Sequence, residues 1–107
     1  MATAPKSEIL KMTHLAGYQS GAVVSVQITK AEGGNVTLFA FDEGQELSEH
    51  TAPFDALVQV LEGEVEIKIA GKPFLLKIGD SIIMPANKAH AVVAKKRFKM
   101  LLTMIKA

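Results

Sequence analysis

The sequence contains no cysteine, which excludes disulfide bonds, thiolate metal clusters and cysteine nucleophiles. It also lacks an apolar run near the about eighteen residues that a membrane-spanning helix needs. The N-terminal stretch MATAPKSEIL has no hydrophobic segment typical of a signal peptide. Charge of neither sign dominates, because 12 Lys and Arg residues against 11 Asp and Glu residues give a net charge of +1. We therefore expect a soluble, cytoplasmic protein that has neither a nucleic-acid nor a membrane partner.

The one basic cluster is KKRFK, residues 95–99. The cluster is short, and no helix-turn-helix pattern accompanies it. Short charge runs usually lie on the solvated surface. We interpret this one as a solvated turn and strand end rather than a nucleic-acid-binding patch.

A length of 107 residues with 49% hydrophobic residues fits one domain with one core. Because no disulfide can cross-link so small a domain, its stability has to come from the core and, we expect, from oligomerisation.

Beyond the first dozen residues, apolar and polar residues alternate with a period of two, which is typical of β-strands. The clearest case is EVEIKI, where Val65, Ile67 and Ile69 alternate with charged residues. The predicted extended segments are residues 22–30, 36–43, 56–61, 64–72 (EVEIKIAGK, ending in a turn), 73–78, 79–85, 89–94 and 97–106. Eight or so short strands at this spacing predict an all-β sandwich or closed barrel.

Two tight turns are predicted between these segments. Residues 33–35, Gly-Gly-Asn, supply the positive φ angles that a tight hairpin demands, and Gly71-Lys72 turns the chain into the strand that starts at Pro73. Residues 7–12, SEILKM, leave open a short helix or an arm strand.

Two segments resemble the paired motifs of the cupin family. In the first, His50 follows Gly44 after five residues, and Gly63 closes the motif within VLEGE; in the second, Gly79, Pro85 and His90 are in register within GDSIIMPANKAH. The second motif often has glycine where this chain has Asn87, a residue that also tolerates a left-handed conformation. The resemblance implies a double-stranded β-helix, or jelly-roll barrel, over residues 21–107, preceded by an N-terminal arm at residues 1–20. It also implies a homodimer, which would cover exposed strand edges.

The resemblance further implies a site inside the barrel. In metal-binding cupins two histidines and a glutamate of the first motif converge with one histidine of the second. His50 and His90 match two of these positions, whereas Ala52 and Ala56 occupy the second histidine and the glutamate position. Two imidazoles alone are a poor site for a divalent transition metal, which usually takes three or four protein donors.

Asp55 is the candidate for a third metal ligand. Strict alternation directs its side chain out of the barrel, but a bulge near Pro53 would redirect it inward and complete a two-histidine, one-carboxylate set with His50 and His90. The alternative is a role for Asp55 in a turn or cap. Alternation also directs Glu49 and Gln59 outward, and we expect His14 at the surface.

The methionines allow two interpretations. Met84, Met100 and Met104 lie on predicted strands among apolar neighbours. A thioether beside two imidazoles suits copper, whereas methionine in a core more often fills irregular gaps.

Two functions follow from the resemblance. One is a binding module that holds a small molecule at His50 and His90, with at most a weakly coordinated divalent metal. The other is a metal-dependent enzyme of the isomerase or dioxygenase type acting on a small organic or sugar substrate. In either case the short side chains Ala52 and Ala56 predict a roomy pocket, with Phe39, Phe41 or Phe54 nearby.

Overall fold

Residues 3–106, the part of the chain that the computed structural model describes, form nine β-strands and one short 3-10 helix. In chain order these are η1 (Met12–His14), β1 (Val23–Ala31), β2 (Gly34–Phe41), β3 (Glu46–His50), β4 (Asp55–Glu62), β5 (Glu64–Ile69), β6 (Lys72–Lys77), β7 (Ser81–Met84), β8 (His90–Ala94) and β9 (Phe98–Ile105). The all-β prediction is confirmed. Within the described residues, no helix is long and apolar enough to cross a membrane.

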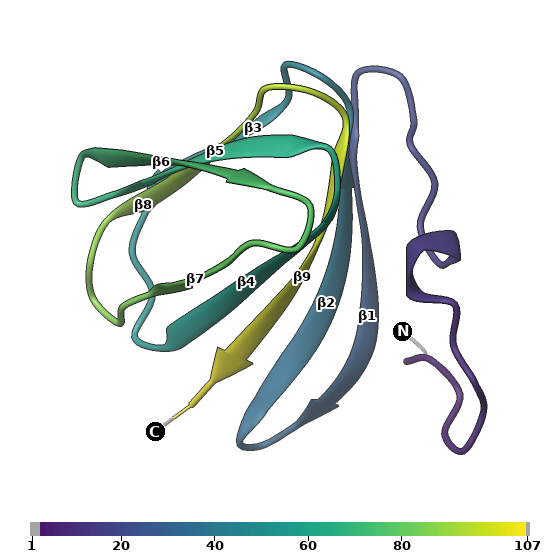
Figure 1. Ribbon diagram of the computed structural model, residues 1–107. Helices are drawn as coiled ribbons and strands as arrows, with labels where there is room; N and C mark the ends of the chain where they lie inside the picture. The colour runs from purple at the N-terminus through teal and green to yellow at the C-terminus, as the bar shows by residue number, and fades with distance from the viewer. Residues whose placement is uncertain (1–2, 107) are drawn as a thin grey trace.

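The strands form two antiparallel sheets that face each other (Figure 1). The larger sheet has the order β1-β2-β9-β4-β7, and the smaller has the order β3-β8-β5-β6. Strands that follow one another in the chain therefore often lie in different sheets, as in β3 and β4 or β7 and β8. This arrangement is the jelly-roll barrel that the sequence predicted.

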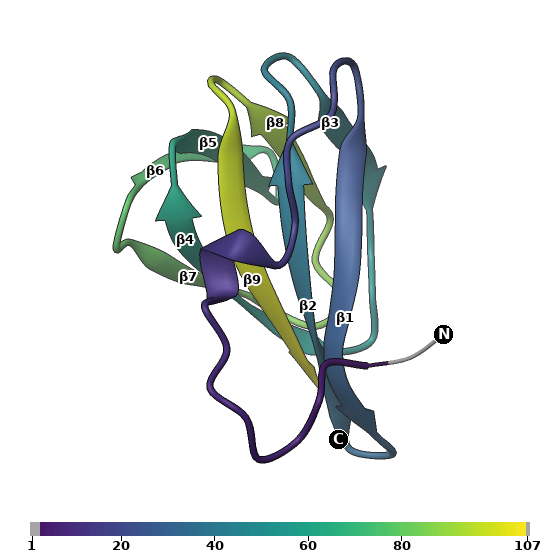
Figure 2. The ribbon, with the colours of Figure 1, turned by 90° about the vertical axis from the view of Figure 1, so that its right-hand side faces the viewer.

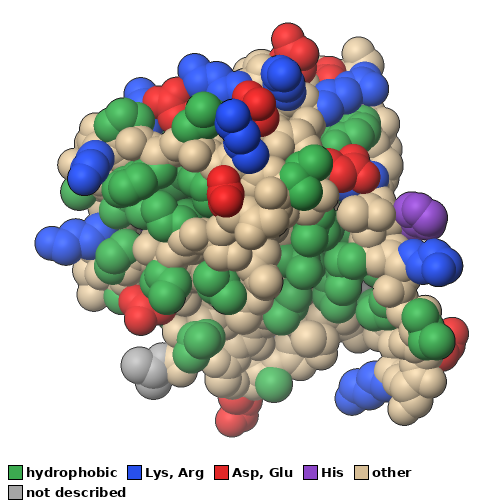
Figure 3. Space-filling model, viewed as in Figure 1, with side chains coloured by type: hydrophobic (Ala, Val, Ile, Leu, Met, Phe, Trp, Pro, Cys, Tyr) green, Lys and Arg blue, Asp and Glu red, His purple; other side chains and the backbone are tan. Residues whose placement is uncertain are grey.

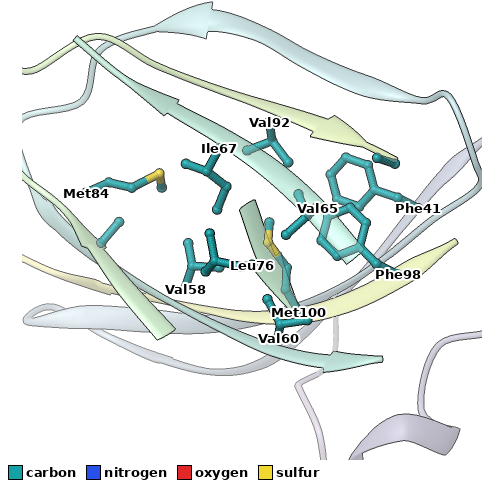
Figure 4. Close-up of a cluster of buried hydrophobic side chains, with 12 residues drawn as sticks. Phe41, Val58, Val60, Val65, Ile67, Leu76, Met84, Val92, Phe98 and Met100 are labelled. Carbon is teal, nitrogen blue, oxygen red and sulfur yellow. The ribbon is translucent and has the colours of Figure 1, made fainter. Parts of the chain in front are cut away.

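The core lies between the sheets and follows from the alternation of the strands. Val65 and Ile67 of β5 are fully buried, while the charged residues between them face outward. Figure 4 shows the cluster, with Met84 at one end and the stacked rings of Phe41 and Phe98 at the other. Each large apolar side chain buried in this way contributes roughly 1.5–3 kcal/mol.

Glycines of the two motifs occupy turns that another residue would strain. Gly63, between β4 and β5, has a φ of 75°, and Gly79, between β6 and β7, has a φ of 88°. A Cβ atom at Gly63 would also collide with the carbonyl oxygen of Arg97. Both positions therefore need glycine, as the motifs predicted.

Both predicted hairpin turns are present, with differences in detail. Of residues 33–35 only Gly34 has a positive φ; it is the first residue of β2 and pairs with Ala31, so the loop itself consists of Glu32 and Gly33. In the second hairpin Ile69 pairs with Lys72, so the turn consists of Ala70 and Gly71, one residue earlier than predicted. The φ angles of Ala70 and Gly71 are 51° and 82°, the left-handed conformation of a tight two-residue hairpin.

The N-terminal arm crosses the outer face of the larger sheet (Figure 2). Its residue Ala16 is buried against Ile28 and Leu38, and the amide of Ala4 donates to the carbonyl of Ile28 at 3.0 Å. Residues 7–11 form neither of the predicted elements; the 3-10 helix Met12–His14 begins at the last residue of that segment. The arm thus covers apolar surface that would otherwise face solvent.

The basic cluster forms the turn between β8 and β9, as expected, and is paired with carboxylates. Lys95 lies 2.9 Å from Glu66, and Arg97 lies 2.8 Å from Asp42. In Figure 3 positive and negative side chains alternate along this upper edge of the molecule. Lys99 differs in being buried: it is only 7% exposed, donates from Nζ to the carbonyl of Thr13 in the arm, and lies 4.0 Å from Glu62.

Candidate functional site

The two motif histidines meet at one end of the smaller sheet. His50 is the last residue of β3, and His90 is the first residue of β8, directly opposite it in the antiparallel ladder. The Nε2 atoms lie 3.0 Å apart, the ring centroids lie 4.3 Å apart, and the ring planes are inclined at 72°. The predicted approach of the two rings is confirmed; their role in binding remains a prediction.

The backbone fixes the tautomer of each ring. Nδ1 of His50 lies 2.8 Å from the carbonyl oxygen of Ser48, and Nδ1 of His90 lies 3.2 Å from that of Lys88. A carbonyl oxygen can only accept a hydrogen bond, so each Nδ1 carries a proton and donates it. In a neutral ring the opposite nitrogen, Nε2, then has a free lone pair.

The pair is therefore one proton short. Three contacts need a proton: the two Nδ1–carbonyl hydrogen bonds and the Nε2–Nε2 contact between His50 and His90. Two neutral imidazoles supply only two. In the neutral pair the two Nε2 lone pairs point at each other and require a partner that accepts electron density.

Burial disfavours a positive charge on His90. His90 is 5% exposed, whereas His50 is exposed. Removal from water lowers the pKa of His90 below its ordinary value, and a positive charge on the nearby His50 lowers it further. The Lys88 carbonyl acts in the opposite direction on this pKa and is the smallest of the three effects. A proton placed on His90 itself is thus an unfavourable way to complete the pair.

The loop before β8 positions His90. Asn87 adopts a φ of 66°, in agreement with the expectation for this motif position. Its amide donates to the carbonyl of Ala52 at 2.7 Å, which ties the second motif to the first. This bond places the start of β8 beside the end of β3.

The other two ligand positions implied by the resemblance carry no donor. Ala52 is half-buried and Ala56 is 4% exposed. Both present only methyl groups.

Asp55 does not replace the missing donors. Its side chain is exposed, and its Oδ1 accepts a 2.9 Å hydrogen bond from the amide of Ala86, so it caps the loop before β8. No bulge interrupts this part of β4, where Asp55 and Ala56 pair in sequence with Ile105 and Met104. The hypothesis of Asp55 as third ligand is thereby corrected in favour of the capping role.

The resulting donor set does not fit the divalent metal that the family resemblance implies. Across residues 3–106, no group of three or more His, Asp or Glu side chains is placed to hold a metal ion. Two imidazole nitrogens remain, fewer than a divalent transition metal usually takes from protein.

A buried methionine lies beside Ala56. Met84 lies directly opposite Ala56 in the β4–β7 ladder and is itself buried in the core. Two surface cavities, of about 220 Å³ at the β1–β2 hairpin and about 320 Å³ beside Gly63 and Lys96, are not lined by either histidine. Neither of these two cavities therefore supports the expectation of a roomy pocket beside Ala52 and Ala56.

The remaining candidate residues lie as follows. Glu49, Gln59 and His14 are exposed, as expected. Met84 and Met100 are buried within the core cluster, and Met104 packs against it, which confirms their packing role. Phe41 stacks on Phe98 at the end of the core far from Met84 (Figure 4).

Sequence reasoning missed a polar cluster under the arm. The hydroxyl of Tyr18 donates to Glu62 at 2.8 Å, and the Nζ of Lys99 lies 4.9 Å from the centre of the Tyr18 ring. Burial, together with the hydrogen bond and the charge of Glu62, raises the pKa of Tyr18. Alternation with Phe98 and Met100 places Lys99 on the outer face of β9, but nothing local indicates that the arm covers that face.

Comparison with known proteins identifies the family. The family profile described as the cupin domain matches residues 37–105. The structure superposes with a TM-score of 0.91 on a conserved Streptococcus pyogenes protein described as of unknown function, at 30% identity over 100% of this chain and 96% of that one. A cupin superfamily protein from Desulfitobacterium hafniense gives a TM-score of 0.91 at 28% identity, covering 99% of this chain and 97% of that one.

A cupin 2 conserved barrel domain protein from Leptotrichia buccalis is 40% identical with a TM-score of 0.88; the match covers 91% of this chain and 47% of that chain, so this chain spans about half of that protein. No match was found among curated proteins. From the profile match and the 30% identity over its full length, we conclude that the chain belongs to the cupin family.

Proposed function

We propose that this cupin binds a small molecule at the His50–His90 pair, through a hydrogen-bond donor of the ligand. The supporting observation is the missing proton: the two Nε2 atoms lie 3.0 Å apart, and both Nδ1 atoms are engaged by carbonyls. A hydroxyl, amide or ammonium group of a ligand supplies what the two lone pairs lack. The ligand then reaches the pair from the side of His50, the exposed ring.

A proton is a weaker candidate for the same place. Burial and the neighbouring ring lower the pKa of His90, so a positive charge on His90 itself is disfavoured. An uncharged donor group satisfies both nitrogens without placing a charge beside the core.

The alternative function, a metal-dependent isomerase or dioxygenase, has less support. It needs a bound metal, and the residues at the implied site supply two donors with methyl groups at the other two positions. The barrel alone argues for no reaction, because one fold hosts many unrelated activities.

A thermal-shift screen of small polar molecules tests the proposal. Each hit is measured again with His50→Ala, with His90→Ala and with the control His14→Ala, which removes an exposed histidine from the arm. We expect binding to be lost in the first two variants and retained in the control. Binding that survives both site variants would refute the proposal.

Metal analysis distinguishes the metal-dependent enzyme from the binding module. The protein is reconstituted with Fe, Mn, Ni, Cu or Zn, dialysed, and analysed for bound metal. Stoichiometric retention of a divalent ion by the wild type, lost in His90→Ala, would favour the enzyme over the binding module.

A homodimer and a cytoplasmic location remain predictions. Ile83 and Ile105, which are 59% and 60% exposed, lie on the outer face of the larger sheet beyond the arm. Light scattering of the purified protein would give the mass of a dimer if the prediction is correct.

A further inference from the structure

Two loops beside the motif histidines lie next to each other at one end of the barrel (Figure 1). Residues 51–54 connect β3, which ends at His50, to β4, which begins at Asp55. Residues 85–89 connect β7 to β8, which begins at His90. The position of His90 relative to His50 therefore depends on how the second loop is held against the first.

Two consecutive backbone amides attach the second loop to the first. The amide of Asn87 donates to the carbonyl of Ala52 at 2.7 Å, and the amide of Ala86 donates to Oδ1 of Asp55 at 2.9 Å. Only the second of these bonds is accepted by a side chain. Because its acceptor is a carboxylate, it belongs to the stronger, charge-assisted class of hydrogen bonds. Asp55 thus holds the first half of the second loop, although its side chain is exposed.

A different contact holds the far end of the second loop. The amide of Ala70, in the hairpin between β5 and β6, donates to the carbonyl of Ala89 at 2.7 Å. Lys88 lies between this attachment and the one at Asn87, and its own amide makes only a long bond, of 3.4 Å, to the carbonyl of Pro85. The direction of the Lys88 carbonyl is therefore set by the attachments on either side of it.

The Lys88 carbonyl decides where His90 carries its proton. Nδ1 of His90 donates to this carbonyl at 3.2 Å, the upper limit of an ordinary N–H···O hydrogen bond, whereas Nδ1 of His50 donates to the Ser48 carbonyl at 2.8 Å. A small displacement of Lys88 therefore breaks the bond at His90 first. The proton of His90 can then move to Nε2 and be donated to Nε2 of His50, 3.0 Å away. A pair that satisfies itself in this way has no free lone pair to offer a ligand.

We infer that Asp55 is a positioning residue that keeps the histidine pair open for a ligand. Its carboxylate holds the Ala86 amide, the loop so held directs the Lys88 carbonyl, and that carbonyl keeps the proton of His90 on Nδ1. This role rests on the proposed function, because an open pair matters only if the pair binds a small molecule. A side chain that is bonded to the loop rather than to either ring then determines whether the pair can accept a donor group.

The test measures the tautomer of His90 in the free, full-length protein by long-range proton–nitrogen NMR with nitrogen-15 histidine. Asp55→Ala and Asp55→Val both remove the acceptor, and valine also favours the start of a strand, which keeps the test available if the alanine variant unfolds. Asp55→Asn retains an oxygen that accepts a hydrogen bond. The matched control is Asp80→Ala: Asp80 is also exposed and accepts from a backbone amide, that of Lys77 at 2.9 Å, but in the turn between β6 and β7.

We expect the proton of His90 on Nδ1 in the wild type, in Asp55→Asn and in Asp80→Ala. In Asp55→Ala and Asp55→Val we expect a signal from His90 protonated on Nε2. The tightest-binding hit of the thermal-shift screen should bind these two variants about tenfold more weakly, the ratio that corresponds to one hydrogen bond. A cap that only stabilises its loop would lower the melting temperature in Asp55→Ala and Asp80→Ala alike and leave the tautomer unchanged.

An unchanged His90 tautomer in Asp55→Ala or Asp55→Val, whichever folds, overturns the positioning role, as does a changed tautomer in Asp55→Asn or Asp80→Ala. A screening hit that depends on both histidines but binds Asp55→Ala as tightly as the wild type also overturns it, and leaves the proposed function intact. A changed tautomer in Asp55→Ala, with no small molecule that binds the wild type, would retain the control of His90 by Asp55 and remove the proposed function.

Discussion

The Nε2 atoms of His50 and His90 face each other at 3.0 Å across neighbouring strands, although 40 positions separate the residues in the chain. Backbone carbonyls hold the proton of each ring on the other nitrogen. This relationship, rather than the barrel itself, is what distinguishes the site, because many barrels of this class serve unrelated functions.

Stability should fall as the solution is acidified, owing to His90. Its pKa in the folded protein lies below the ordinary value of 6.5, so below that pH the unfolded chain binds more protons. As far as His90 is concerned, the free energy of unfolding is therefore highest above about pH 6.5. It falls progressively as the pH drops toward the lower pKa that His90 has in the folded protein. Denaturant titrations between about pH 7.5 and about pH 5 check this. His90→Gln should flatten the profile and His14→Gln should not; an equal slope in wild type and His90→Gln would contradict the assignment.

The hairpin between β5 and β6 carries an avoidable strain. Ala70 has a φ of 51°, which costs a residue with a Cβ atom about 1–2 kcal/mol. Ala70→Asn, which gives the favoured Asn-Gly pair, should raise the free energy of unfolding by about 0.5–1 kcal/mol. Ala70→Val, with a branched side chain, should lower it. Chemical denaturation measures both, and a neutral or destabilising asparagine would argue against this turn geometry.

Gly63 cannot be replaced without cost. Its φ of 75° and the position of the Arg97 carbonyl oxygen both oppose a side chain. Gly63→Ala should lower the free energy of unfolding by more than about 2 kcal/mol. Gly17→Ala, where a Cβ would meet nothing within 4 Å, is the matched control and should change stability by less than about 0.5 kcal/mol. Similar melting temperatures for the two variants would be inconsistent with the turn described.

Lys99 should anchor the N-terminal arm. It is buried beneath the arm and donates to the Thr13 carbonyl, with Glu62 4.0 Å away. Lys99→Met should cost about 1–3 kcal/mol, because it leaves the carbonyl unsatisfied and removes a charge near Glu62. Lys95→Met, which loses a half-exposed ion pair, should cost less than about 1 kcal/mol.

Proteolysis provides a second measurement on the same two variants, Lys99→Met and Lys95→Met. If Lys99 holds the arm, trypsin should cut at Lys11 faster in Lys99→Met than in Lys95→Met. Equal rates of cleavage in the two variants would indicate that Lys99 does not hold the arm in place.

Much of the fold could be predicted because alternation is a local signal. In EVEIKI every second residue is apolar, and the structure buries Val65 and Ile67 accordingly. The position of the hairpin turn could not be predicted exactly, because alternation does not distinguish a turn at Ala70-Gly71 from one at Gly71-Lys72. The strand pairing shows the turn at Ala70-Gly71, one residue before the predicted position. The spacing of the two motifs likewise predicted correctly that His50 and His90 lie close together, because both residues match motif positions of a family whose fold spans the whole barrel.

The rest depends on contacts between distant segments. Asp55 caps the loop at Ala86, 31 positions away, and no local pattern distinguishes this role from that of a ligand. Lys99 is buried by an arm 86 positions earlier in the chain. The missing proton at the histidine pair depends on where two backbone carbonyls point, which the sequence does not encode locally.

The state of the two imidazoles can be measured directly. Long-range proton–nitrogen NMR spectra of protein labelled with nitrogen-15 in histidine report which nitrogen of each ring is protonated. Near neutral pH we predict that His50 and His90 both carry their proton on Nδ1, with Nε2 unprotonated, and that a bound ligand shifts both Nε2 signals together. A proton on Nε2 of either ring in the free protein would contradict the account, because the pair would then have no lone pairs to share with a ligand.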